Sequence, residues 1–180
     1  MKQFNVPTID EVNETNQTIF DQLTEKLGFV PNLYAAYAHS GNALKNYLEL
    51  TGAPTSLSNK EKEVVNLAVS EVNGCNYCLA VHTAIGKMNG FNEDQIIEFR
   101  QGHSTSDSKL NALANFAKNI VENIGKANDA IVTKFYDAGY TKENLVDTIV
   151  LVGDKTMSNY LHGTTAVPID FPEAKALELA

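Results

Sequence analysis

The two cysteines of this chain lie three residues apart, at Cys75 and Cys78, and a histidine follows at His82. On a helix, residues spaced by three and then four positions share one face, so the three side chains should form a single stripe. Two thiols at this spacing can close a disulfide. An imidazole one turn beyond Cys78 can exchange a proton with it, directly or through one water. The pattern therefore predicts a redox-active dithiol, in which one sulfur attacks and the other resolves the intermediate.

The residues just before the pair favour a reactive thiolate. Asn73 and Gly74 form a dipeptide that often interrupts a helix, so Cys75 is expected at the N-terminus of the following helix. Unpaired amides and the helix dipole stabilise negative charge there. Cysteines in C-x-x-C pairs at helix starts can have a pKa several units below the usual value.

Two other interpretations fit the same spacing. Two buried structural cysteines would show the same pattern. A structural zinc site usually needs four ligands in two pairs, whereas this chain offers one pair with His82, and His39, His103 and His162 are distant candidates. A cysteine pair followed by an in-register histidine favours dithiol chemistry over both, and no bound metal is expected.

A histidine that transfers protons works best beside a carboxylate, which orients the ring and shifts its pKa. Glu63 lies on the edge of an apolar helical stripe upstream of the cysteines. If the chain folds back at the asparagine–glycine turn, Glu63 comes closer to His82 than to the first cysteine, which predicts a relay from Glu63 through His82 to Cys78. Glu71, next to the turn, is the competitor, and Glu61 is expected to be a solvated charge.

Apolar residues recur at spacings of three and four along most of the chain, so the elements that position these residues are predicted to be helices. Ser58 and Glu61 form a capping box before the helix that leads to the cysteines. The fold class predicted is all-α, a single domain over residues 1–180 with about eight helices and an extended apolar C-terminal tail at 167–172. The expected helices start near Thr8 or Asp10 and at Pro31, and cover about 44–50, 58–72, 75–89, 92–101, 107–124, 128–138 and 141–162.

Composition narrows the classes of function. The chain has 180 residues, 43% of them hydrophobic, and a net charge of −8. An acidic surface repels phosphate backbones and anionic lipid, so neither nucleic acid nor a membrane is an expected partner. There is no run of 18 apolar residues and no apolar signal core near the start. A cytoplasmic location is therefore expected, where a close cysteine pair is more often catalytic than a structural disulfide.

The motif resembles a known family. The spacing of the candidate residues is similar to that of the alkylhydroperoxidase AhpD core, within the carboxymuconolactone decarboxylase superfamily. In this chain the motif consists of Glu63, eleven residues, Cys75-Asn76-Tyr77-Cys78, three residues and His82. The flanking stretches LGFVPNLYAAYAHSGNAL and SNYLHGTTAVPIDFPEA are similar to its single-domain uncharacterised peroxidase-related branch. The resemblance covers roughly residues 20–174, with the motif core at 58–90.

The resemblance implies a peroxidase. Cys78 corresponds to the peroxidatic cysteine, Cys75 to the resolving cysteine, and His82 with Glu63 to the proton relay. The implied substrate is hydrogen peroxide or an alkyl hydroperoxide. No bound cofactor is implied; the reductant would be an external dithiol such as a lipoylated adaptor protein. The family's all-α chains associate as trimers or as hexamers built from dimers, so a homo-oligomer is expected.

One position departs from the family pattern. The best-known AhpD proteins carry a histidine directly before the second cysteine, where this chain has Tyr77. A phenol cannot shuttle protons at neutral pH as imidazole can. Tyr77 and His162 are candidate pocket residues, although packing is the favoured role for both. Two alternative functions stay open: a decarboxylase-like lyase in which the cysteines are bystanders, and a non-catalytic redox sensor.

Overall fold

The computed structural model describes residues 4–177 of the chain. Within that range the protein is an all-helical single domain with nine α-helices, one short 3-10 turn and no strand. The all-α prediction is confirmed; the count exceeds the expected eight by one, and the shortest helix has six residues. The elements are η1 (Ile9–Glu11), α1 (Glu14–Leu27), α2 (Asn32–Tyr37), α3 (Ala43–Thr51), α4 (Asn59–Val72), α5 (Asn76–Met88), α6 (Glu93–Arg100), α7 (Ser108–Glu122), α8 (Asp129–Asp137) and α9 (Lys142–Thr165).

Capping residues set most of these boundaries. Ser58 accepts a hydrogen bond from the Glu61 N–H at 3.3 Å, and the Glu61 carboxylate accepts one from the Ser58 N–H at 2.9 Å, which confirms the predicted capping box at α4. The first predicted helix is divided, because Asn13 is extended and caps α1 through the Asn16 N–H. Between Phe4 and that cap, η1 is the only helical element.

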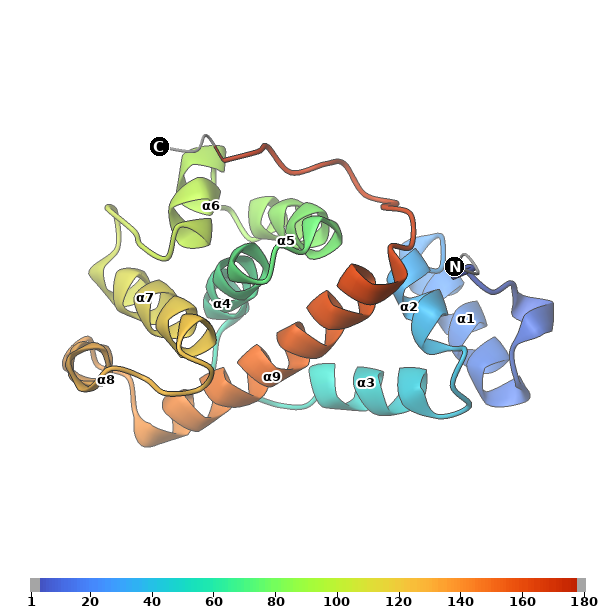
Figure 1. The fold of residues 1–180 in the computed structure, drawn as a ribbon, viewed down its shortest axis with the longest axis horizontal. Helices are drawn as coiled ribbons and strands as arrows, with labels where there is room; N and C mark the ends of the chain where they lie inside the picture. Colours follow the sequence, from blue (N-terminus) through green and yellow to red (C-terminus); the bar gives the residue numbers. More distant parts are fainter. Residues whose placement is uncertain (1–3, 178–180) are drawn as a thin grey trace.

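Helix α4 lies at the centre of the molecule, in contact with α5, α6, α7 and α9 (Figure 1). Its apolar residues form a continuous buried stripe, and Val64, Val65 and Leu67 have no exposed surface. A helix that is apolar on most of its circumference must be surrounded by other elements. This central position fixes α4 relative to every helix that contributes to the candidate site.

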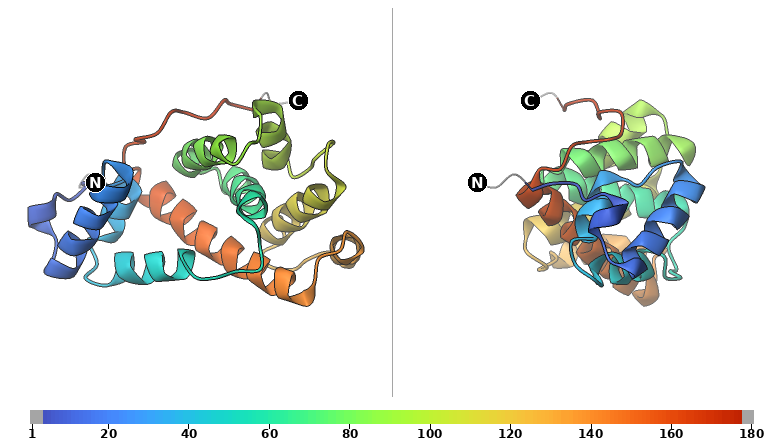
Figure 2. Two further views of the ribbon diagram at one scale, coloured as in Figure 1. Left: turned by 180° about the vertical axis from the view of Figure 1, so that it is seen from behind. Right: turned by 90° about the vertical axis from the view of Figure 1, so that its right-hand side faces the viewer.

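The N-terminal helices α1 to α3 form one end of the molecule, and α6 to α8 form the other (Figure 1). Helix α9 runs diagonally between the two ends and contacts α2, α3, α4, α5 and α7. Seen from behind, α4 and α5 lie between α9 and the C-terminal tail (Figure 2). Among the helices of residues 4–177, none is long and apolar enough to cross a membrane.

The extended tail after α9 packs on the chain's own surface. The Asp170 carboxylate accepts a hydrogen bond from the Asn32 N–H at 2.6 Å, at the first residue of α2. Further along, the Lys175 carbonyl accepts a hydrogen bond from Arg100 at the end of α6. The tail therefore links α2 to α6 across the outside of α5 (Figure 1).

Candidate functional site

Cys75 is the N-cap residue of α5, as the asparagine–glycine turn predicts. Its φ of −91° and ψ of 92° are extended, and its sulfur accepts a hydrogen bond from the Cys78 N–H at 3.3 Å. Gly74 has a φ of +65°, a left-handed conformation that glycine adopts without strain, and this turn reverses the chain between α4 and α5. The Cys75 sulfur therefore lies against the backbone amides at the start of α5, which have no partner within the helix and stabilise negative charge.

The two cysteines are free thiols with unequal acidities. A hydrogen bond from the Cys78 thiol, reinforced by the Cys78 N–H, lowers the pKa of Cys75 to about 7 against the opposing effect of burial. Donating that hydrogen bond, together with burial, raises the pKa of Cys78. Cys75 therefore ionises before Cys78.

Glu63 and His82 form a buried pair on facing sides of the α4–α5 hairpin. The His82 Nδ1 lies 2.8 Å from Glu63 Oε2, and Asn66 donates to the other carboxylate oxygen at 3.1 Å. Both side chains are less than a tenth exposed. The folding back of the chain that the sequence predicted brings these two residues together.

Burial and the nearby positive charge of Lys155 lower the pKa of His82, so the ring is neutral at pH 7. Interaction with His82 and Lys155 outweighs burial and lowers the pKa of Glu63, which stays ionised. The carboxylate then accepts the Nδ1–H and leaves Nε2 as the free base. Within residues 4–177 no hydrogen bond joins His82 to either sulfur, so the last link of the predicted relay needs a bridging water or a small movement.

The other two glutamates have different roles. Glu71 forms an ion pair with Arg100, with Oε2 2.7 Å from the guanidinium Nε, and takes no part in the pair with His82. Glu61 is not the solvated charge that the sequence predicted, since it is 9% exposed. It is held by its capping box and by Lys109, whose Nζ lies 3.2 Å from Glu61 Oε1.

Helix α9 contributes residues that the sequence analysis missed. Lys155 is 7% exposed, and within residues 4–177 it makes no ion pair at salt-bridge distance. Its charge lowers the pKa of Glu63, Cys75 and His82. Asn159 is 2% exposed, donates to Ser70 at 3.3 Å, and lies beside both sulfurs, where it favours their thiolate forms. No local sequence signal marked them, because the inward face of α9 is mostly polar: Thr148, Asp154 and Ser158 are buried there together with Lys155 and Asn159.

Tyr77 and His162 join the site to the tail. The Tyr77 hydroxyl accepts a hydrogen bond from the Leu33 N–H at 3.2 Å, and its ring lies 5.3 Å from that of His162, centroid to centroid. His162 Nε2 lies 3.2 Å from the Val167 carbonyl oxygen. Both aromatic side chains thus pack α5 and α9 against the tail, and proton transfer is not their evident task.

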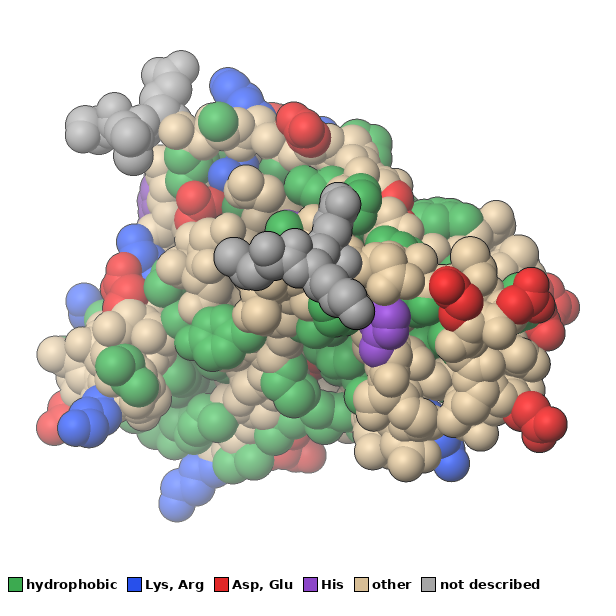
Figure 3. Space-filling model, turned by 45° about the vertical axis from the view of Figure 1, so that its right-hand side comes forward, with side chains coloured by type: hydrophobic (Ala, Val, Ile, Leu, Met, Phe, Trp, Pro, Cys, Tyr) green, Lys and Arg blue, Asp and Glu red, His purple; other side chains and the backbone are tan. Residues whose placement is uncertain are grey.

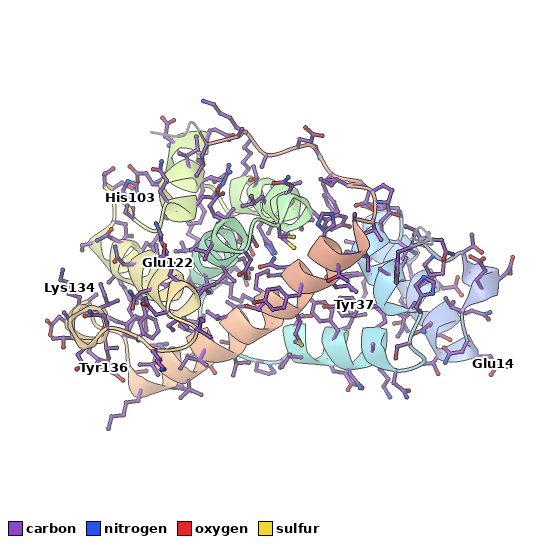
Figure 4. The ribbon with its side chains drawn as sticks, viewed as in Figure 1. Glu14, Tyr37, His103, Glu122, Lys134 and Tyr136 are labelled. Atoms are coloured by element: carbon purple, nitrogen blue, oxygen red, sulfur yellow. The ribbon has the colours of Figure 1, made fainter. Side chains whose placement is uncertain are left out.

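The sulfurs lie in an apolar cluster. Cys75 and Cys78 are 1% and 2% exposed, and they pack with Leu33, Ala36 and Val167. Tyr37, labelled in Figure 4 between α2 and α9, and Phe171 of the tail lie against the same cluster. A substrate or reductant reaches either sulfur only after some of these groups move.

The distant histidines lie apart from the cysteines. His39 contacts the Asn5 carbonyl oxygen and the Phe4 ring, and His103 lies in the loop after α6 (Figure 4). In the described part of the chain no group of three or more histidine, cysteine, aspartate or glutamate side chains is arranged to hold a metal ion.

Comparisons with known proteins place this arrangement in context. Residues 38–122 match the carboxymuconolactone decarboxylase family. No curated protein matches the chain. Several solved structures share its fold at low sequence identity.

An uncharacterised peroxidase-related protein from Silicibacter sp. TM1040 has a TM-score of 0.79 at 23% identity, over 93% of this chain and 94% of that one. A protein from Ralstonia eutropha JMP134, described as an alkylhydroperoxidase AhpD core, has a TM-score of 0.83 at 20% identity, over 93% and 92%. A variant of the debrominase Bmp8 in complex with 2,3,4-tribromopyrrole has a TM-score of 0.74 at 14% identity, over 87% and 86%. These likenesses establish an AhpD-like fold.

Proposed function

Because the chain contains a domain of the carboxymuconolactone decarboxylase family in an AhpD-like fold, we propose that it is a thiol-dependent peroxidase. The observation that carries the proposal is the hydrogen-bonded Cys75–Cys78 pair at the start of α5, beside the buried Glu63–His82 pair. A structural role would not require a lowered thiol pKa at one sulfur and a neutral histidine with a free Nε2 nearby. Perturbed ionisable groups of this kind cluster at functional sites.

The reaction follows from thiolate chemistry. One thiolate attacks an oxygen of the hydroperoxide, the O–O bond breaks, and the sulfur becomes a sulfenic acid while an alkoxide leaves. His82 accepts the proton of the attacking thiol and returns it to the alkoxide, which departs as an alcohol. The second sulfur then attacks the sulfenic acid, a disulfide forms and water is released. An external dithiol, such as a lipoylated adaptor, reduces the disulfide and closes the cycle.

Two orders of attack fit this couple. The family resemblance assigns the first attack to Cys78. The resting charge distribution favours Cys75 instead, since thiolate is the nucleophile and Cys75 has the lower pKa. Treating each single-cysteine variant with peroxide and a sulfenic-acid trap, followed by mass spectrometry, identifies the cysteine that is oxidised first.

The proposed activity is tested by steady-state consumption of hydrogen peroxide and cumene hydroperoxide with dithiothreitol as reductant. We expect Cys75→Ser and Cys78→Ser each to abolish turnover. Glu63→Gln and His82→Ala should reduce the rate by about 10²-fold or more, the usual contribution of a general acid–base group. Glu49→Gln, in an exposed surface pair of α3, is the matched control and should retain full activity.

Other results would support other functions. Oxidation that stops after about one equivalent of peroxide per chain would contradict turnover and indicate a redox sensor. Lactone decarboxylation that persists in both serine variants would make the cysteines bystanders. Absence of peroxide consumption with dithiothreitol and with a lipoyl donor would overturn the proposal.

A further inference from the structure

Lys155 is buried, and the part of the chain that the structure describes offers its ammonium group no partner. The residue is 7% exposed, and within residues 4–177 neither an ion pair nor a hydrogen bond holds its side chain. On the face drawn in Figure 3, by contrast, lysine and arginine side chains lie mainly at the margins, where water surrounds them. A buried charge is normally paired, because burial without a partner costs free energy. The ammonium group is therefore available to a group that comes from outside the chain.

Asn66 of α4 carries a second buried polar atom without a partner. The residue is 5% exposed, and its Nδ2 donates to Glu63 Oε1 at 3.1 Å. A carboxylate oxygen can only accept, so this bond fixes which end of the amide faces Glu63. Within residues 4–177 the other end, Asn66 Oδ1, has no hydrogen-bond partner. The site thus offers a buried acceptor as well as a buried donor.

The donor and the acceptor lie on facing helices, α9 and α4. Asn159 of α9 donates to Ser70 of α4 at 3.3 Å, and the start of α9 bonds the residues before α4, so the two helices run in the same direction. Lys155 lies one turn before Asn159 on the same face of α9. Asn66 lies one turn before Ser70 on α4, so the two unpartnered groups are level with each other. The Ser70 carbonyl also accepts the Cys75 N–H at 2.9 Å, which places this contact directly beside the dithiol.

The leaving oxygen needs such a group when Cys75 attacks first. A sulfur that is already ionised releases no proton on attack, and His82 is neutral at pH 7, so it has no proton to return. The Cys78 thiol is a poor donor, because its pKa is raised. The charge of Lys155 acts on both sulfurs and on His82, so its ammonium group lies near the reacting atoms.

We propose that Asn66 and Lys155 bind the two oxygens of the hydroperoxide, an inference that rests on the proposed peroxidase function. Asn66 Oδ1 accepts a hydrogen bond from the terminal O–H, and Lys155 Nζ donates to the other oxygen. The Cys75 thiolate attacks the terminal oxygen, the S–O bond forms, the O–O bond breaks, and the electron pair goes to the leaving oxygen. The sulfur is oxidised to a sulfenic acid, and the ammonium group stabilises the alkoxide. The proton of the Cys78 thiol and one proton from solvent complete the alcohol and the water.

Single-turnover oxidation of the reduced full chain by two kinds of peroxide tests the role of Lys155. Cumene hydroperoxide releases a strongly basic alkoxide, whereas peracetic acid releases a weakly basic carboxylate that needs little stabilisation. Lys155→Met should slow oxidation by cumene hydroperoxide by about 10²-fold, the usual effect of removing one donor to a developing oxyanion, and oxidation by peracetic acid far less. Each rate is divided by the fraction of Cys75 that is ionised, taken from the thiolate absorbance of that variant. Lys142→Met, at an exposed lysine of the same helix, is the matched control.

Two further measurements complete the test. Asn66→Leu should slow oxidation by both peroxides, because both present an O–O–H group to the acceptor. In the wild type, a series of hydroperoxides should show rates that depend less on the basicity of the leaving oxygen than the rates of a free thiolate do, which requires no variant to fold. Equal losses with both peroxides in Lys155→Met, no loss in Lys155→Met or in Asn66→Leu, or a wild-type dependence as steep as that of a free thiolate would each overturn the proposal.

The outcome can be separated from that of the peroxidase proposal, because single-turnover oxidation needs no reductant. Rapid oxidation that is selectively slowed in Lys155→Met, without sustained peroxide consumption, would support the role of Lys155 and contradict the peroxidase. Oxidation of the wild type no faster than that of free cysteine would overturn both.

Discussion

Cys75 has two tasks that are usually given to different residues. Its sulfur caps α5 by accepting the Cys78 N–H, and the same contact stabilises the sulfur as an anion. Serine, threonine, asparagine or aspartate normally takes the capping position. With a cysteine at this position, the contact that caps the helix also stabilises the thiolate. The effect of each neighbouring residue on the ionisation of Cys75 can therefore be predicted.

The thiolate absorbance at 240 nm should rise with a midpoint near pH 7, the pKa of Cys75. Cys75→Ser should abolish this step. Cys78→Ala should move it to higher pH, because the thiol that donates to Cys75 is lost. A step near pH 7 that survives Cys75→Ser and disappears in Cys78→Ala would reverse the assignment and restore the order implied by the family resemblance.

Lys155 should act on the same titration from a distance. Removing its charge in Lys155→Met should raise the pKa of Cys75, His82 and Glu63, since Lys155 lowers all three. We expect the 240 nm midpoint to rise by about half a unit, as for a charge that is near but not in contact. Lys45→Met, on the exposed side of α3, is the control. An unchanged midpoint in Lys155→Met would show that its charge does not reach the sulfurs.

At the scale of elements, the C-terminal tail covers the dithiol. Val167 is buried against the cysteines, Phe171 packs on the same cluster, and Asp170 attaches the tail to α2. Access to the sulfurs therefore depends on an extended segment that has no helical hydrogen bonds of its own and is held by contacts to α2, α5, α6 and α9. Such a segment can open locally without unfolding the whole protein.

Loosening the tail should expose the thiols. We expect Asp170→Ala and Phe171→Ala to increase the rate of reaction with a bulky disulfide reagent several-fold, without a comparable loss of thermal stability. Glu173→Ala, at an exposed position of the same tail, is the matched control. Equal rates in all three variants and the wild type would mean that the reagent reaches the sulfurs by another route.

The helices of the site differ in how well the sequence predicts their role. The Ser58–Glu61 capping box and the Asn73–Gly74 turn give local signals, so the ends of α4 and the start of α5 were predictable, and with them the approach of Glu63 to His82. Lys155 and Asn159 lie about eighty residues further along the chain. No local rule states which face of α9 turns inward, so these polar residues could not be assigned to the site before the fold was known.

At the scale of the whole molecule, the buried ionisable groups predict acid sensitivity. Burial lowers the pKa of His82 and His162, so below about pH 6.5 the unfolded chain takes up protons that the folded chain does not. The lowered pKa of Glu63 extends the same effect below about pH 4.5. Stability therefore falls as the pH falls, by up to about 1.4 kcal/mol per pH unit for each fully buried group and by less for His162, which is only partly buried.

Thermal melts between about pH 8 and pH 4 test this prediction. The melting temperature should decline below about pH 6.5, where the unfolded histidines titrate. A variant with both Glu63→Gln and His82→Gln should show a shallower decline, because it removes the two most buried contributors together. A wild-type melting temperature that stays constant or rises on acidification would contradict the linkage.

The cap at the start of α5 has a consequence for electron transfer. The hydrogen bond from the Cys78 N–H stabilises an ionised sulfur, and it loses that charged acceptor once the sulfur enters a disulfide. Whatever stabilises the reduced form raises the reduction potential of the couple, by about 30 mV for each tenfold change in its equilibrium constant. The Cys75–Cys78 disulfide should therefore be reduced more easily than a disulfide formed by two unperturbed thiols. Cellular dithiols of ordinary reducing strength should suffice to regenerate the thiol form.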